Sequence, residues 1–419
     1  MTLLSNPQPR HLSTIIHARA LLLLLALSVC GVDATAQSVV ASGFLSGQLS
    51  GASSNGYTYL LLNEYDLHED WEEEDGEEME EGMLVYNQLP IDAEAQMGSK
   101  MFRMHLYCLD ARHRVLWSKE MGMTDNSRPF PICVDDSGNV YAGSNTDEER
   151  LVVKSFDPKG NERLSVPIDS GYALNGIILD VDTLTVLASS SRMVSIPIDD
   201  SSVTFQPFRE HKTYRIDVPK GSLKKSYRNP EIGYMQLGGF TVAPSLNAWI
   251  HILYQDDTIG LAFGWDTLAF KWELQKMAGT RILAAGGDPG GLFFVASDSK
   301  SGGYRLYKKV DWFKYADSGI TTTIPPDDAF GFPTMFAYPT GGISIAFLGP
   351  KWLQLRHYDG MLRLVDSSNT DLAKLKAATI SHIHPRDRGG YEIVYFTQKK
   401  NLRTASILSI DEKGRVMKE

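Results

Sequence analysis

Seven short strand-like segments recur along this chain, each ending in an aspartate followed by a turn, and this repeat constrains the fold more than any other feature. Successive aspartates lie 47, 42, 67, 45, 48 and 52 residues apart. The aspartates are Asp110, Asp157, Asp199, Asp266, Asp311, Asp359 and Asp411. An aspartate carboxylate can accept hydrogen bonds from the backbone of its own turn, which explains why this residue type recurs. A period of about 40 to 50 residues is typical of chains that repeat one small sheet around an axis.

The segment 131–168 contains one complete repeat. Four short apolar segments, at 132–134, 140–143, 151–156 and 163–168, are separated by turns that contain Gly, Asn and Asp. These residue types accept the backbone angles that tight hairpins need. No long window of the chain has the period of an amphipathic helix. We therefore predict an all-β fold, a seven-bladed β-propeller of four-stranded antiparallel blades.

The last repeat is too short to supply its own fourth strand after Asp411. The segment 38–45, with the sequence SVVASGFL, has the composition of a strand. We expect it to pair into the last blade and close the ring, because closure removes the open edges that a linear array would expose.

The same repeat resembles a known family. It follows the pattern V-D-x-x-G-N-V-Y-x-x-G, then a strand V-V-K-x-x-D-x-x-G-N. The matching residues are Val134, Asp135, Gly138, Asn139, Val140, Tyr141, Gly143, Val152, Val153, Lys154, Asp157, Gly160 and Asn161. In these residues the chain resembles the bacterial β-propeller repeat family, related to NHL and quinoprotein-type propellers. The resemblance implies a propeller in an extracytoplasmic setting, and it transfers no catalytic residues.

Residues 1–36 have the features of a secretory signal peptide. Arg10 and Arg19 precede the apolar run 20–29, and small residues end at Ala36. The run is about half of the roughly 20 residues that a membrane-spanning helix needs. A lipoprotein acylated at Cys30 is the alternative, but Val29 departs from the small residue expected before that cysteine. We predict a secreted or periplasmic monomer without a membrane span, in which 37–419 form a single propeller domain.

The net charge of -10 has one main source, the insertion 64–81, which holds 12 acidic residues and no Lys or Arg. Without it and the first 36 residues, 39 basic residues face 38 acidic ones, so nucleic acid is not an expected ligand. The candidate binding residues are Glu72, Glu73, Glu74, Asp75, Glu77 and Glu78. The insertion is interpreted as a solvated disordered loop, a docking surface for a basic partner, or a weak calcium site without EF-hand spacing.

A second insertion, 209–228, carries the opposite charge. Its candidate binding residues are Lys224, Lys225 and Arg228. Loops between second and third strands emerge on the same face of a propeller as the loops between blades. We therefore expect both insertions to form one recognition face for a protein or cell-envelope partner. The alternative is that these basic residues only decorate a surface loop.

Three residues near the ends of first strands are candidates for the central channel: Asp135, Asp288 and His384. His382 and His384 share one face of a strand because side chains alternate along it. With His357 and Asp387 they could hold a metal ion; the alternative is that they are packed or surface histidines.

The sequence lacks the G-x-S-x-G, H-E-x-x-H and P-loop motifs. The main functional prediction is therefore an exported, non-enzymatic binding or scaffold propeller with no predicted cofactor. The alternative is a propeller hydrolase or lyase with a divalent metal in the central channel.

Overall fold

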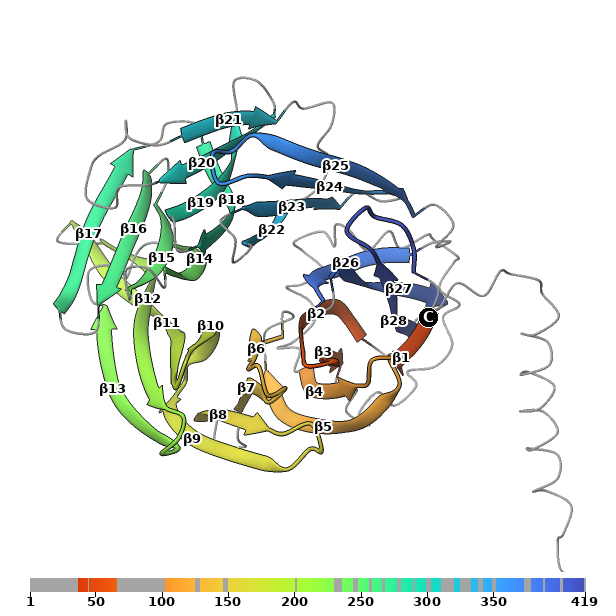
Figure 1. Cartoon of the computed structure of the whole chain (residues 1–419). Helices are drawn as coiled ribbons and strands as arrows, with labels where there is room; N and C mark the ends of the chain where they lie inside the picture. Colours follow the sequence, from red (N-terminus) through yellow and green to blue (C-terminus); the bar gives the residue numbers. More distant parts are fainter. Residues whose placement is uncertain are drawn as a thin grey trace, which may run out of the picture.

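The chain folds entirely into antiparallel sheets in the part that the structure describes. The computed structural model describes residues 37–43, 45–65, 102–124, 129–145, 150–199, 202–229, 236–243, 248–255, 258–265, 268–276, 280–288, 291–298, 303–309, 320–324, 333–337, 342–348, 352–372, 378–386, 389–399 and 402–417. Its strands form seven four-stranded sheets arranged in a ring (Figure 1). The predicted all-β propeller is confirmed.

Blades are numbered here in chain order, and within each the strands follow one another from the centre outward. Blade 1 contains β2 (Leu45–Ser54), β3 (Tyr57–Tyr65), β4 (Phe102–Leu109) and β5 (Val115–Thr124). Blade 2 contains β6 (Ile132–Val134), β7 (Val140–Asn145), β8 (Arg150–Phe156) and β9 (Glu162–Ser170). Blade 3 contains β10 (Ala173–Asp180), β11 (Thr183–Asp199), β12 (Ser202–Asp217) and β13 (Ser222–Asn229).

The next three blades repeat the same order. Blade 4 contains β14 (Gln236–Ala243), β15 (Ala248–Gln255), β16 (Thr258–Trp265) and β17 (Leu268–Lys276). Blade 5 contains β18 (Thr280–Asp288), β19 (Gly291–Asp298), β20 (Tyr304–Lys309) and β21 (Ile320–Ile324). Blade 6 contains β22 (Pro333–Ala337), β23 (Ile343–Leu348), β24 (Trp352–Tyr358) and β25 (Leu364–Asp371).

Blade 7 joins the two ends of the described chain. It contains β26 (Ala378–Pro385), β27 (Tyr391–Lys399) and β28 (Leu402–Ile410), and β1 (Gln37–Gly43) is its outermost strand. Gln37 pairs with Leu408 and Gly43 with Arg403 in antiparallel register. The predicted closure of the ring by the N-terminal segment is confirmed. In each blade the first strand is innermost, and the innermost strands of neighbouring blades contact one another around the ring.

The aspartate turns have one shared geometry. In the turn after β28, the Oδ1 atom of Asp411 accepts hydrogen bonds from the N–H groups of Lys413 and Arg415 at 2.9 and 2.8 Å. Asp110, Asp157 and Asp359 bond to their own turns in the same way. The local cause that predicted these aspartates is confirmed. These turns and the hairpins between first and second strands lie at one end of the blades, which we name the turn face.

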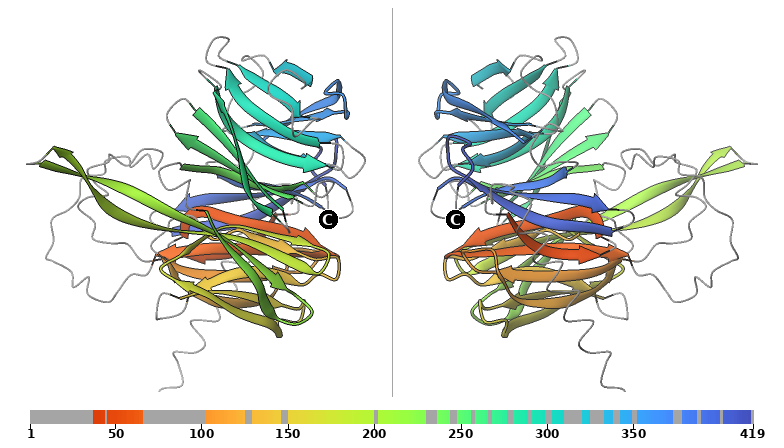
Figure 2. Two further views of the ribbon diagram at one scale, coloured as in Figure 1. Left: turned by 90° about the vertical axis from the view of Figure 1, so that its left-hand side faces the viewer. Right: turned by 90° about the vertical axis from the view of Figure 1, so that its right-hand side faces the viewer.

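The long third interval between aspartates has a cause different from the predicted one. Residues 209–228 are not an inserted loop, because they belong to β12 and β13, the third and fourth strands of blade 3. The extra length is in a hairpin of β11 and β12 that projects from the ring (Figure 2). Asp199 therefore lies at the tip of this hairpin, and Asp217 makes the turn after the third strand. The spacing of 42 residues between Asp157 and Asp199 suits the period, and for this reason the repeat predicted the turn at Asp199.

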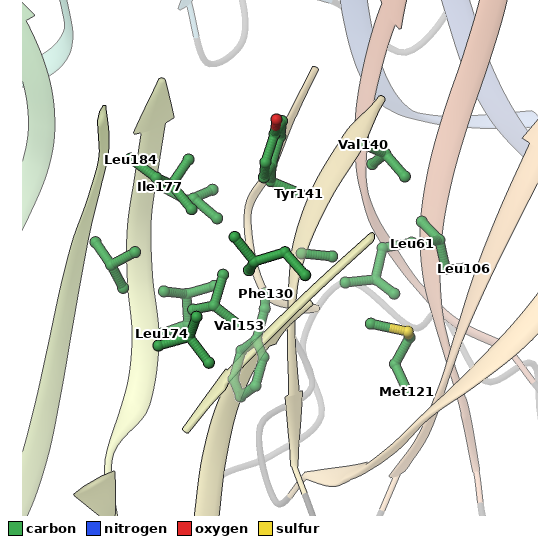
Figure 3. Packing of buried hydrophobic residues seen from close by; sticks show 14 of the residues in the cluster. Leu61, Leu106, Met121, Phe130, Val140, Tyr141, Val153, Leu174, Ile177 and Leu184 are labelled. Atoms are coloured by element: carbon green, nitrogen blue, oxygen red, sulfur yellow. The ribbon is translucent and has the colours of Figure 1, made fainter. Parts of the chain in front are cut away.

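The apolar side chains of the strands pack between blades. The largest buried cluster lies in blades 1 to 3 and includes Leu61, Leu106, Val153, Leu174 and Leu184 (Figure 3). In β9, the outermost strand of blade 2, the buried residues Leu164 and Val166 alternate with exposed ones. In β7, an inner strand of the same blade, five successive positions are buried. Sheets covered on both faces by neighbouring blades account for this pattern.

Candidate polar site between blades 7 and 1

A buried carboxylate lies where blade 7 meets blade 1. Glu392 is the second residue of β27 and is 3% exposed. Its Oε2 atom accepts hydrogen bonds from Thr58 Oγ1 at 2.8 Å and from Ser53 Oγ at 3.1 Å, both on blade 1. The five residues Ser53, Thr58, His113, His384 and Glu392 are named here the Glu392 cluster.

Two imidazoles approach the same carboxylate. His384 Nε2, from β26, lies 2.9 Å from Glu392 Oε2, and His113 Nε2, from the turn after β4, lies 3.0 Å from Oε1. Arg386 adds a positive charge, with its Nε atom 3.4 Å from Oε1. Since an ionised carboxylate only accepts hydrogen bonds, both imidazoles donate their Nε2–H groups to it.

The contacts decide the charge of Glu392. Burial alone would raise the pKa of this carboxyl, but the hydrogen bonds from His113 and His384 outweigh burial and hold its pKa well below the usual range. The carboxylate is therefore ionised at neutral pH and bridges two blades. A buried ion with this many donors is stable because its partners replace the water that it has lost.

His113 has a backbone conformation that is uncommon for its residue type. Its φ angle is 56°, at a turn position where Gly138, Gly160 and Gly414 stand in blades 2 and 7. A non-glycine residue in this left-handed region costs about 1 kcal/mol, and histidine tolerates it better than most residues. The bond to Glu392 offsets this cost.

A second polar group lies on the other face of blade 7. Tyr391 precedes Glu392, and successive side chains of a strand point to opposite faces. The Tyr391 hydroxyl donates to Ser344 Oγ at 3.0 Å, and Ser344 in turn contacts His357 Nδ1. The two residues at the start of β27 therefore tie blade 7 to blade 6 and to blade 1.

Neither group is an accessible Ser-His-acid triad. In the Glu392 cluster both Ser53 and Glu392 contact the same nitrogen, His384 Nε2, whereas a proton relay needs the acid and the serine on different nitrogens. Ser344 contacts His357 Nδ1, and His357 Nε2 faces the backbone oxygen of Glu412 at 3.3 Å, so the second nitrogen has an orienting acceptor that is not a carboxylate. Ser344 is, however, fully buried at 0% exposure.

Of the predicted channel residues, only His384 belongs to this site. Asp135 follows β6 as expected, but its carboxylate accepts hydrogen bonds from Ser137, Asn139 and Tyr141 in its own blade. Asp288 ends β18 in blade 5, and its side chain lies outside the described residues. Asp135 and His384 therefore take part in separate polar contacts, and the channel role of Asp288 stays a prediction.

The predicted binding residues divide between strands and undescribed segments. Lys224, Lys225 and Arg228 belong to β13, the outermost strand of blade 3, and Lys224 is exposed. Glu72, Glu73, Glu74, Asp75, Glu77 and Glu78 lie outside the described residues, between the second and third strands of blade 1 as predicted. Their binding roles stay predictions.

Sequence reasoning missed Glu392 and His113, although a signal for Glu392 existed. Glu392 occupies the position that Tyr59 holds in blade 1 and Tyr141 in blade 2, since each pairs with the residue two before the turn aspartate. An acidic residue at a buried aromatic position of a repeat indicates a local polar site. His113 carried no comparable signal, because a turn residue gives no indication of burial.

No family model matches this chain, and no curated protein sequence matches it. Its fold is similar to several solved structures. A prolyl endopeptidase structure matches with 10% identity over 98% of this chain and 54% of that chain, with a TM-score of 0.50. Acylaminoacyl peptidase of Pyrococcus horikoshii matches with 11% identity over 89% and 52%, with a TM-score of 0.48. The β-propeller domain of the trilobed protease of Pyrococcus furiosus matches with 7% identity over 87% and 92%, with a TM-score of 0.44.

The match to the prolyl endopeptidase supports the propeller fold. The chain spans about half the length of the first two peptidases. The main functional prediction, a non-enzymatic binding or scaffold module, is corrected by this comparison, because the solved structure that matches over 98% of this chain is a prolyl endopeptidase. The finding agrees better with the predicted alternative, a propeller hydrolase.

Two further findings concern membrane spans and metal sites. In the described part of the chain no helix is long and apolar enough to cross a membrane. Within the same residues, no group of three or more His, Cys, Asp or Glu side chains is arranged to hold a metal ion. His357 contacts Ser344 and faces the backbone oxygen of Glu412, and Asp387 lies outside the described residues, so the metal set of these two residues with His382 and His384 stays a prediction.

Proposed function

We propose that this chain is a propeller hydrolase that acts on peptide or related amide bonds. The observation that carries the proposal is the fold shared with a prolyl endopeptidase over 98% of this chain. The acylaminoacyl peptidase and trilobed protease propellers point to the same reaction class. Because the chain spans about half of the prolyl endopeptidase, the activity of a whole enzyme is part of the proposal.

The proposal assigns a class of reaction and no catalytic residue. Ser344 and His357 have the contacts of a nucleophile and its base, but a fully buried hydroxyl cannot meet a substrate. The proposal also includes an exported location, which the signal features of residues 1–36 support. A divalent metal in the channel, and the finer resemblance to NHL and quinoprotein-type propellers, stay predictions from the sequence.

A hydrolysis assay tests the proposal. The purified full chain is incubated with fluorogenic N-acyl aminoacyl and prolyl peptides, and release of the fluorophore is measured against a heat-inactivated sample. We expect turnover with at least one amide substrate. Absence of turnover with every amide substrate, at protein concentrations that retain the folded circular dichroism spectrum, would overturn the proposal.

Two controls refine the result. Ser344→Ala should leave turnover unchanged, since the hydroxyl is buried, and loss of turnover in a folded variant would instead place Ser344 in the reaction. A second sample treated with EDTA distinguishes metal-dependent hydrolysis from metal-independent hydrolysis. Loss of activity there, with recovery on adding Zn²⁺, would support the metal-dependent form of the prediction.

A further inference from the structure

Two histidines of β26 have buried ring nitrogens that contact no polar group in the described part of the chain. These nitrogens are His382 Nε2 and His384 Nδ1. His384 is 4% exposed as a residue. An unpartnered buried acceptor is uncommon in proteins, and it calls for a specific explanation such as an ion or a water molecule.

The other nitrogen of each ring is held by a hydrogen bond. His384 Nε2 donates to the Glu392 carboxylate, and it lies 2.9 Å from Oε2. The ring of His382 bonds to the backbone of Gly51 in β2, which leaves Nδ1 as its donor because Nε2 has no partner. These bonds fix both tautomers, so that the unpartnered nitrogens each carry a lone pair. Histidines that bind metals are held in this way, by a carboxylate or a backbone carbonyl at the second nitrogen.

The spacing of the two rings suits a shared ion. Residues two apart on a strand point to the same side of the sheet. The ring centroids of His382 and His384 are 5.4 Å apart, with planes inclined by 37°. Two imidazoles bound to one tetrahedral ion through nitrogens at about 2.0 to 2.1 Å have ring centroids roughly 5 Å apart.

The open edges of the two rings face the same point of blade 1. A Cβ atom added to Gly51 would lie 3.0 Å from His382 Cδ2, the carbon bonded to Nε2, and 3.1 Å from His384 Nδ1. Glycine at position 51 therefore keeps this point free of a side chain. The ring edge of His382 that contains Cδ2 and the Nδ1 atom of His384 therefore both lie beside Gly51, and Leu60 Cδ2 is 3.1 Å from the same added Cβ.

We propose that His382 Nε2 and His384 Nδ1 together bind one transition-metal ion of the kind that imidazole prefers, such as Zn²⁺, Ni²⁺ or Cu²⁺. The remaining coordination positions are taken by water or by a bound molecule. Glu392 is a positioning residue in this site, because it holds the ring of His384 without contacting the ion.

Metal titration tests this proposal without reference to hydrolysis. The full chain, produced without a histidine tag and stripped with EDTA, is titrated with Zn²⁺ and with Cu²⁺ by calorimetry. We expect one equivalent of ion to bind with a dissociation constant in the micromolar range. The electron paramagnetic resonance spectrum of the Cu²⁺ sample should contain superhyperfine splitting from two imidazole nitrogens.

Three variants make the test specific. His382→Gln should weaken binding at least tenfold, and it is expected to fold because it loses only the bond to Gly51. His384→Gln should do the same, and its melting curve without metal shows whether it is folded. His357→Gln should bind like the unaltered chain, since His357 lies at the interface of blades 6 and 7. Absence of stoichiometric binding, or equal affinity in all three folded variants, would overturn the proposal.

Discussion

Two neighbouring blade interfaces of this propeller have different side chains at the same strand position, one charged and one neutral. Between blades 7 and 1, Glu392 is an ionised carboxylate held by hydroxyls and imidazoles. Between blades 1 and 2, Tyr59 holds the same strand position and donates one neutral hydrogen bond to the Gly138 carbonyl at 2.6 Å. Its ring packs near Trp117, with centroids 6.0 Å apart. The repeat therefore determines which strand position contacts the neighbouring blade, but not whether a charged or a neutral side chain makes that contact.

The two solutions differ in how they respond to change. An apolar interface loses stability in proportion to the contact area removed. Burial raises the pKa of Tyr59 in this interface, so its hydroxyl stays neutral and adds no dependence on pH near neutrality. A buried ion is balanced against its own desolvation, so removing one partner leaves the others uncompensated. The predictions below test this difference.

The largest effect is expected for Glu392→Leu. The substitution removes the carboxylate and leaves His113, His384 and Arg386 without their buried acceptor, so the free energy of unfolding should fall by about 3 to 5 kcal/mol. Urea denaturation measures this value. Glu162→Leu, on the outer strand of blade 2, is the matched control and should change stability little. A loss below about 1 kcal/mol for Glu392→Leu would mean that the cluster contributes no net stability.

Leu61→Ala tests the apolar interface. Leu61 is fully buried in the cluster of blades 1 to 3, and its truncation should cost about 2 to 4 kcal/mol through lost contacts and a residual cavity. Urea denaturation at pH 7 and at pH 5 should give the same loss. A loss that depends on pH would contradict the separation of the two interfaces.

Acid should weaken the polar interface selectively. The pKa of His382 is about 3 in the folded chain and about 6.5 when unfolded, so the unfolded chain binds more protons between these values. The free energy of unfolding therefore falls as pH drops below 6.5, by about 2 kcal/mol between pH 7 and pH 5 from this residue. Glu392, with its lowered pKa, adds a further loss below about pH 4.5.

The comparison of unaltered chain and His382→Gln isolates this contribution. Both are unfolded in urea at a series of pH values in the presence of EDTA, so that bound metal does not alter the result. The variant should have the shallower dependence on pH. Identical slopes would show that His382 is charged or exposed in the folded chain.

Two single hydroxyl groups complete the comparison, and the smallest effect is expected for Tyr59→Phe. Thr58→Val removes a hydrogen bond to the ionised Glu392 and should cost about 1.5 to 3 kcal/mol. Tyr59→Phe removes a neutral hydrogen bond to Gly138 and should cost about 0.5 to 1.5 kcal/mol. Thermal melting of the two variants in parallel gives their ranking. The opposite ranking would mean that the hydrogen bond to the charged Glu392 contributes no more stability than the neutral hydrogen bond to Gly138.

Much of the fold could be predicted from the sequence, because turn chemistry is local. Asp110, Asp157, Asp359 and Asp411 bond to backbone groups within four residues, so their spacing carried the repeat. The same reliance on spacing explains the error at Asp199, where a long hairpin changed the period. The closing strand was also predictable, since one repeat lacked a strand and one segment had no other place.

The candidate site was less accessible to the same reasoning. Glu392, His113 and Thr58 are far apart in the sequence and meet only because blade 7 lies beside blade 1. The strand pattern put His382 and His384 on one face, but it could not indicate that their lone pairs are buried. Contacts between blades that are far apart in the sequence form only in the closed ring, and a local sequence pattern does not encode them.

The pairing of β1 with β28 sets an order of events during synthesis. β1 leaves the ribosome before every other described strand, and its partner β28 is the last described strand to leave, so blade 7 stays incomplete until β28 has been made. Pairing over such a distance along the chain is slow, and the edge of an unpaired strand favours aggregation in the meantime. The Glu392 cluster lies in this last blade, so its bonds to blade 1 can form only as the ring is completed. In a newly made chain, the hydrogen bonds from blade 1 to Glu392 are therefore among the last contacts of the propeller to form.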